Sequence, residues 1–87
     1  MQQIRKQIDK IDQQLLDLLA QRKDLVLQLA KLKFESNLPL KQKRREKEVF
    51  EKISRLSQEL NLNPKFTKKL FKLIIKNSLN IQTSQNL

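Results

Sequence analysis

The chain has 87 residues, with 19 basic and 9 acidic side chains and a net charge of +10. It contains no Cys, His, Gly, Trp or Tyr. These absences exclude a disulfide framework, a Cys/His zinc site, thiol or imidazole catalysis and glycine-rich phosphate-binding loops. The length suits one small domain, taken as residues 1–87.

The positive charge is concentrated in the second half of the chain. Residues 1–40 carry 7 basic and 5 acidic side chains, a net +2, whereas residues 41–87 carry 12 and 4, a net +8. Such a field attracts anions, whether nucleic acid, an acidic protein surface or a small polyanionic metabolite. No uncharged apolar run reaches about 18 residues, and the N-terminus lacks a signal-peptide core. We therefore expect a cytoplasmic protein without a membrane segment.

The first predicted element is one unusually long helix. Apolar side chains recur every three or four positions over residues 2–34 without an internal Pro, and Asn37 and Pro39 then mark a loop. Such a helix is about 50 Å long, whereas a compact chain of this size is about 31 Å across. Its apolar stripe must therefore be covered by another chain, and an intertwined homodimer is the simplest solution.

Two further helices follow, so the predicted fold class is all-α. The second helix covers about residues 42–60 and is followed by a break at Asn63 and Pro64. The third covers about residues 64–82, with Asn63 as a favourable N-cap and Pro64 as a favourable first residue. The polar residues 83–87 are expected to fray.

Polar residues interrupt the apolar faces of the first and third helices. Arg22 has large apolar residues three and four positions to either side, so its guanidinium faces the core and needs an anionic partner. Lys33 follows eleven residues later on the same face, about 16 Å away. Ser78 and Gln82 continue the apolar face of the third helix at i, i+4. Together they indicate a buried polar pocket for an anion.

Arg5 and three residues of the second helix extend this candidate pocket. Arg5 lies about 25 Å from Arg22 along the first helix, so it can join the pocket only from the other chain of an antiparallel dimer. Gln42, Arg45 and Glu46 share one face at i, i+3, i+4. Arginines and a lysine suit a substrate with two carboxylates, and a glutamate accepts from a hydroxyl. An amide and an ammonium donate to an oxygen that gains charge in a transition state.

The chain resembles the small all-helical chorismate mutases of the AroQ type over nearly its whole length. The resemblance rests on IRKQIDKIDQQLLDLLAQR at 4–22, AKLK ending at Lys33, LPL at 38–40, RE at 45–46, LNPKF at 62–66 and LFKLIIKNSLNIQ at 70–82. Each motif is ordinary, but the set is specific. It implies an intertwined three-helix homodimer that rearranges chorismate to prephenate in phenylalanine and tyrosine biosynthesis.

The resemblance implies that three residues carry the catalysis. Arg22 would clamp a substrate carboxylate, helped by Arg5 from the other protomer. Lys33 would contact a carboxylate and the ether oxygen, and Gln82 would donate to the same ether oxygen. The rearrangement is intramolecular and needs no nucleophile, general base, metal or cofactor, because catalysis comes from holding the reactive conformer and stabilising charge on the breaking ether oxygen.

The remaining residues are implied to bind substrate. Glu46 would hold the ring hydroxyl, and Arg45 and Ser78 would complete the carboxylate contacts. Gln42 stands where well-known family members have an acidic residue near the hydroxyl. Because a backbone N–H survives that change, we expect retuned binding at Gln42 rather than lost activity.

Each polar residue also has a structural interpretation. Arg22 could pair with a core glutamate, Lys33 could extend to solvent at a helix end, and Arg45 with Glu46 could be a surface ion pair. Arg5 and Gln42 could be solvated, and the polar positions near the end of the third helix could mark fraying.

Three other functions stay open. An isochorismate-pyruvate lyase on the same fold would use nearly the same polar residues. A non-catalytic helical module could bind a protein partner. The basic run KQKRREK at 41–47 could bind nucleic acid, although the chain has only 4 aromatic residues and no glycine-containing helix-turn-helix turn.

Overall fold

The structure is a computed structural model that describes residues 1–85, and those residues form three helices without a strand. Helix α1 covers Gln2–Glu35, α2 covers Lys43–Glu59 and α3 covers Pro64–Gln85. The all-α prediction is confirmed, and the predicted bounds of the first two helices are correct to within one residue.

Helix α3 extends further than the sequence predicted. Residues 83–85, expected to fray, are helical, while residues 86–87 lie outside the described part of the chain. The hydroxyls of Thr83 and Ser84 donate to the carbonyls four residues earlier, at 2.9 and 3.0 Å. No Pro or Gly follows Pro64 in this segment, so nothing in its sequence interrupts the helix.

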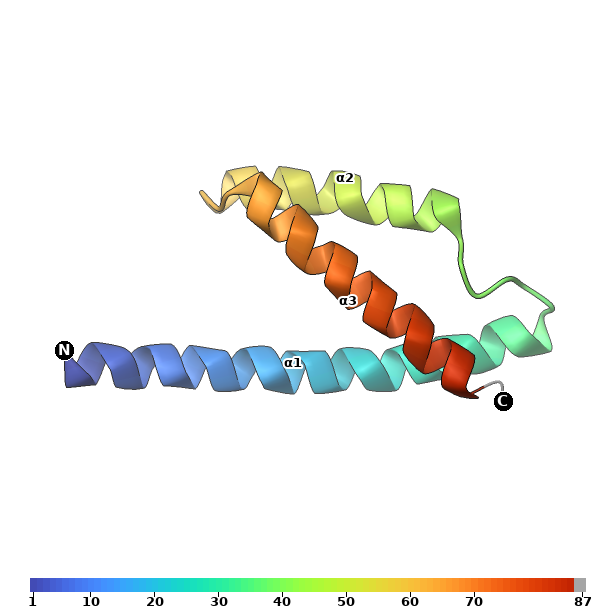
Figure 1. Ribbon diagram of the computed structural model, residues 1–87, viewed down its shortest axis with the longest axis horizontal. Coiled ribbons are helices and arrows are strands. Elements are labelled where there is room, and N and C mark those ends of the chain that lie inside the picture. Colours follow the sequence, from blue (N-terminus) through green and yellow to red (C-terminus); the bar gives the residue numbers. More distant parts are fainter. Residues whose placement is uncertain (86–87) are drawn as a thin grey trace.

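Helix α3 is the central element of the arrangement. It packs against both α1 and α2, whereas α1 and α2 do not pack against each other within residues 1–85. Figure 1 shows α3 running diagonally from the end of α2 to the C-terminal part of α1, with the N-terminal part of α1 extending beyond both. The chain measures 52 × 24 × 15 Å. The long first helix therefore overshoots the rest of the chain, as its length predicted.

The hydrophobic core of the single chain is very small. Among the described apolar residues, Val26 and Ala30 are the two that are buried. The rest of the α1 stripe is exposed, including Ile4, Ile8, Ile11, Leu15, Leu18, Leu19, Leu25, Leu29 and Leu32. A single chain thus leaves most of its longest apolar face in contact with water.

Helices α1 and α2 end in the same kind of turn, built on asparagine instead of glycine. Asn37 and Asn61 have φ of 55° and 56°, the left-handed conformation. The N–H groups of Leu38 and Leu62 donate to the carbonyls of Lys33 and Ser57, each at 2.8 Å. This is the Schellman pattern, and asparagine is the residue that best replaces glycine there. The turn after α1 sends the chain back past Lys33.

Local polar contacts fix the junction between α2 and α3. Asn63 caps α3 as predicted, since its Oδ1 accepts from the N–H of Lys65 at 2.9 Å. Pro64 begins the helix. The hydroxyls of Ser57 and Thr67 are buried and hydrogen-bonded at 2.6 Å, which satisfies both groups between the helices.

No helix among the described residues has the length and apolar character needed to cross a bilayer.

Candidate functional site

A hollow of about 170 Å³ lies where the three helices and the segment before α2 meet. It gathers seven of the eight residues predicted from the sequence, namely Arg22, Lys33, Gln42, Arg45, Glu46, Ser78 and Gln82. The rest of its wall is apolar and consists of Val26, Leu29, Leu40, Val49, Ile75 and Leu79. Arg5 does not line it and is exposed on the N-terminal part of α1.

Arg22 meets a neutral hydroxyl instead of the anion that the sequence led us to expect. Its side chain is half-buried, and NH1 donates to Ser78 Oγ. The Ser78 hydroxyl in turn donates to the carbonyl of Ile74 at 2.9 Å. Among residues 1–85, the ion pairs do not include Arg22, so the interpretation as a cation paired with a core glutamate is wrong. Burial lowers the pKa of Arg22, although a guanidinium stays charged at neutral pH.

Lys33 is buried at the end of α1 and connects three parts of the chain. Its Nζ donates to the carbonyl of Leu40 at 2.7 Å and to Gln82 Oε1 at 3.1 Å. Burial lowers its pKa, because desolvation destabilises the charged ammonium more than the neutral amine. The interpretation of Lys33 as a side chain extended to solvent is therefore wrong.

The contact of Lys33 with Leu40 could not be found by residue type. The acceptor is a main-chain carbonyl, which any residue supplies, so the side chain at position 40 carries no signal of it. The turn at Asn37 reverses the chain after α1 and thereby brings this carbonyl back to the ammonium. The LPL segment at 38–40 was a useful pointer only as part of the family resemblance.

Gln82 lies beside Lys33, on the part of the wall of the hollow that α3 supplies. Its side chain is buried, and Nε2 donates to the carbonyl of Ser78 at 3.3 Å. Ser78 is buried as well, one helical turn earlier. Both residues are in the interior of α3, so the interpretation of these polar positions as a frayed helix end is wrong. The remaining amide hydrogen of Gln82 is available to an acceptor in the hollow.

Glu46 brings a carboxylate into the hollow without satisfying it completely. Its Oε2 is buried, and within the described residues no donor reaches it. Gln42 is the half-buried N-cap residue of α2, with extended backbone at φ −124° and ψ 100°, and its side chain makes no cap hydrogen bond. Its side chain is thus free to line the hollow.

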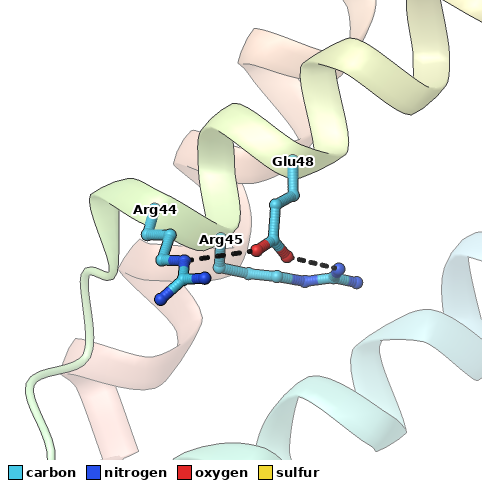
Figure 2. A network of polar contacts seen from close by, with 3 residues as sticks. All are labelled: Arg44, Arg45 and Glu48. Carbon is cyan, nitrogen blue, oxygen red and sulfur yellow. Dashed lines mark ion pairs between the residues drawn. The ribbon is translucent and has the colours of Figure 1, made fainter.

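Arg45 borders the hollow from its solvent side. Figure 2 shows the Glu48 carboxylate between Arg44 and Arg45. The Glu48 oxygens lie 3.6 Å from Arg44 Nε and 3.7 Å from Arg45 NH1, and all three side chains are largely exposed. Such exposed pairs contribute little to stability. The ion-pair partner of Arg45 is therefore Glu48 and not Glu46, and its guanidinium can leave this partner for a stronger anion at small cost.

The fold and this hollow define an all-helical protein with a cationic pocket, in which Arg22, Lys33 and Arg45 outnumber the single carboxylate of Glu46. The family of type II chorismate mutases matches residues 4–83 of the chain. The chain belongs to this family.

Individual relatives agree with the family match. The chain is 41% identical over 75 residues to a bifunctional chorismate mutase/prephenate dehydratase of Buchnera aphidicola, covering 86% of this chain and 20% of that protein. It is 42% identical over 60 residues to the protein of that name from Aquifex aeolicus, covering 69% and 17%. A chorismate mutase of Methanocaldococcus jannaschii is 32% identical over 80 residues, covering 92% and 81%. The chain thus spans about a fifth of the bifunctional relatives and most of the archaeal one.

Proposed function

We propose that this chain catalyses the rearrangement of chorismate to prephenate, as one mutase domain over residues 1–87. The observation that carries the proposal is the pairing of Lys33 and Gln82 at 3.1 Å on the wall of a cationic hollow. In this contact Gln82 Oε1 accepts from the Lys33 ammonium, so the Gln82 Nε2 donor of the same amide is held beside Nζ, and both N–H groups can reach one substrate oxygen. Membership of the type II chorismate mutase family supplies the substrate and the reaction.

The proposed reaction needs a charged, shaped cavity and no covalent step. The C–O bond of the ether breaks while a C–C bond forms within the same molecule, and negative charge grows on the ether oxygen. The Lys33 ammonium and the Gln82 amide stabilise that charge, in a site where low polarity strengthens them. The apolar wall of Val26, Leu29 and Ile75 holds the substrate in the compact conformation in which the reacting carbons are close.

The other polar residues orient the substrate in this proposal. Arg22 and Arg45 each bind a carboxylate through a planar guanidinium, with the Ser78 hydroxyl beside Arg22. The buried Glu46 Oε2 accepts a hydrogen bond from the ring hydroxyl, which would supply the donor that it lacks within the described residues. Gln42 lies near enough to the hollow to adjust how that hydroxyl is held.

We further propose that the chain acts as a homodimer and that Arg5 enters the site of the other protomer. The single chain exposes 7852 Å², whereas a compact folded chain of its mass exposes about 5,400 Å². An excess of this size on each chain matches the interface of an obligate dimer. The exposed stripe on α1 from Ile4 to Leu19 is the surface to be covered, and Arg5 lies at its start.

The experiment that tests the activity is the loss of chorismate absorbance with purified protein, followed by chromatography of the product. Prephenate formed in proportion to protein is the expected result. No loss of chorismate by a folded dimer would contradict the proposal. The variants Arg22→Ala and Lys33→Ala should lose turnover while size-exclusion chromatography shows the dimer of the parent protein.

The same assay with isochorismate separates the mutase from a lyase of the same fold. Salicylate and pyruvate as products would replace our proposal with the lyase. The proposal also includes the cytoplasmic location expected from the sequence, which fractionation of the source cells would test.

A further inference from the structure

Helix α3 carries a net charge of +5, half of the net +10 of the chain, on one face away from the candidate site. Helix α3 contains five lysines and no acidic residue. They are Lys65, Lys68, Lys69, Lys72 and Lys76, here called the lysine stripe, and all are exposed. Their spacing of three and four places them on one face of the helix, about a third of a turn from Ser78 and Gln82.

The lysine stripe forms no ion pair within the described part of the chain. The ion pairs among residues 1–85 join Glu48 to Arg44 and Arg45 and involve none of these lysines. Lys65 with Lys69, and Lys68 with Lys72, stand at i, i+4, where like charges destabilise a helix. The stripe is therefore a repulsive arrangement that an external anion would relieve.

A groove of about 810 Å³ runs between α2 and this face of α3. Lysines 65, 68 and 72 form one side of it, Lys47 belongs to the other, and Glu51 is the acidic residue among its lining side chains. Half-buried apolar residues of α2, including Phe50 and Ile53, also line the groove. No residue of α1 lines it, so the groove is separate from the hollow around Lys33.

We infer that this groove docks an acidic amphipathic helix of another protein. Lysines at the edge match glutamates or aspartates on one face of such a helix, and the apolar residues of the groove match the other face. Nucleic acid fits less well, because this edge lacks the arginines that grip phosphate in pairs, and Phe50 is half-buried and not presented for stacking.

The test measures binding of a short fluorescein-labelled peptide by fluorescence anisotropy with the full chain. The peptide carries glutamates on one helical face and leucines on the other. The triple variant Lys65→Glu/Lys68→Glu/Lys72→Glu should weaken binding by about tenfold or more. The matched control Lys6→Glu/Lys10→Glu/Lys31→Glu makes the same change of net charge on exposed positions of α1, and should leave affinity within about twofold.

A serine-substituted peptide and an oligothymidylate serve as two additional probes of the groove. A peptide with its leucines replaced by serine should bind at least about tenfold more weakly, because the apolar contact is lost. Three outcomes would each overturn the inference. Both triple variants could weaken binding equally, the serine peptide could bind as well as the leucine peptide, or an oligothymidylate could bind more tightly with the same dependence on these lysines. The triple Lys→Gln variant at the same stripe positions repeats the comparison if the Glu variant does not fold.

The inference does not rest on the proposed activity. None of the stripe lysines lines the hollow, so the stripe variants should turn over chorismate like the parent protein if the mutase proposal holds. Failure of the mutase assay would leave the peptide comparison intact, and failure of the peptide comparison would leave the mutase assay intact.

Discussion

The Nζ atom of Lys33 lies 3.1 Å from Oε1 of Gln82, and this hydrogen bond joins the end of α1 to the last turns of α3. The same ammonium donates to the carbonyl of Leu40, so one cation fixes both the third helix and the loop before α2. Because both side chains are buried, their mutual contact also fixes the direction of the Gln82 amide.

Gln82→Met should reduce kcat by about 10²- to 10³-fold with little change in KM, because methionine keeps the length and removes the donor to the developing charge. Steady-state kinetics on chorismate measures the effect. Thr83→Val is the matched control, since the next side chain along α3 is exposed and binds only its own helix among the described residues. Equal rates for Gln82→Met and the parent protein would remove Gln82 from the catalytic proposal.

The activity should fall on the alkaline side because of Lys33. Burial lowers the pKa of this ammonium from its ordinary value of 10.5. The protonated form is the active one in our proposal, so kcat/KM should decrease as the pH rises through the lowered pKa. Lys33→Arg, if it retains activity, should move this decrease to higher pH, since a guanidinium keeps its proton.

Unfolding does not explain such an alkaline loss. A lysine with a lowered pKa in the folded state binds its proton more tightly in the unfolded chain, so its contribution to the free energy of unfolding rises with pH over this interval. Circular dichroism at each pH checks that the protein stays folded. A pH-independent kcat/KM up to pH 10.5 would contradict the role of Lys33.

Arg22→Leu should separate stability from activity. Leucine continues the apolar stripe of α1, and the substitution removes a half-buried cation that meets only a neutral hydroxyl among the described residues. We expect the free energy of unfolding to rise by about 1 kcal/mol while turnover is lost. Urea denaturation gives the stability. A clear decrease in stability would mean that Arg22 has a structural role instead.

Mixing two inactive variants tests whether Arg5 acts across a dimer. Arg5→Ala and Lys33→Ala should each be inactive, because each removes one cation from the site. After joint unfolding and refolding, random pairing restores one complete site in half of the dimers, which gives about a quarter of the parent activity. No recovery from mixed dimers, confirmed as mixed by two different tags, would contradict the shared site.

Asn61→Val should destabilise the chain by about 1–2 kcal/mol, because a β-branched side chain is strained at φ 56°. Asn61→Gly is the control and should retain the stability of the parent protein, since glycine adopts this conformation freely. Thermal denaturation of the two variants makes the comparison. Equal melting temperatures for Val and Gly at position 61 would contradict the strain argument.

The helices and their ends could be predicted because they depend on local chemistry. The spacing of Ile4 to Leu32 determined α1, and Asn63 with Pro64 determined the start of α3. The length of α1 also predicted that this helix would extend beyond the hydrophobic core of its own chain. The polarity of the sequence after Gln82 predicts fraying, and α3 instead continues to Gln85, because backbone hydrogen bonds form without regard to side-chain polarity.

The contacts among the site residues could be predicted only in part. The periodicity of the sequence placed Arg22, Lys33, Ser78 and Gln82 on inward faces, and the shared face at i, i+3, i+4 on the second helix added Gln42, Arg45 and Glu46. Which residue meets which is a property of the tertiary structure, since it depends on how α3 crosses the other two helices. That crossing gives Arg22 a hydroxyl instead of an anion and gives Lys33 the Gln82 amide, whereas the turn at Asn37 gives Lys33 its main-chain carbonyl. The sequence by itself determined the helices, their polar interruptions and the excess of positive charge. The packing of α3 decided the partners, because contacts between residues 49 or 56 positions apart depend on a geometry that no local pattern contains.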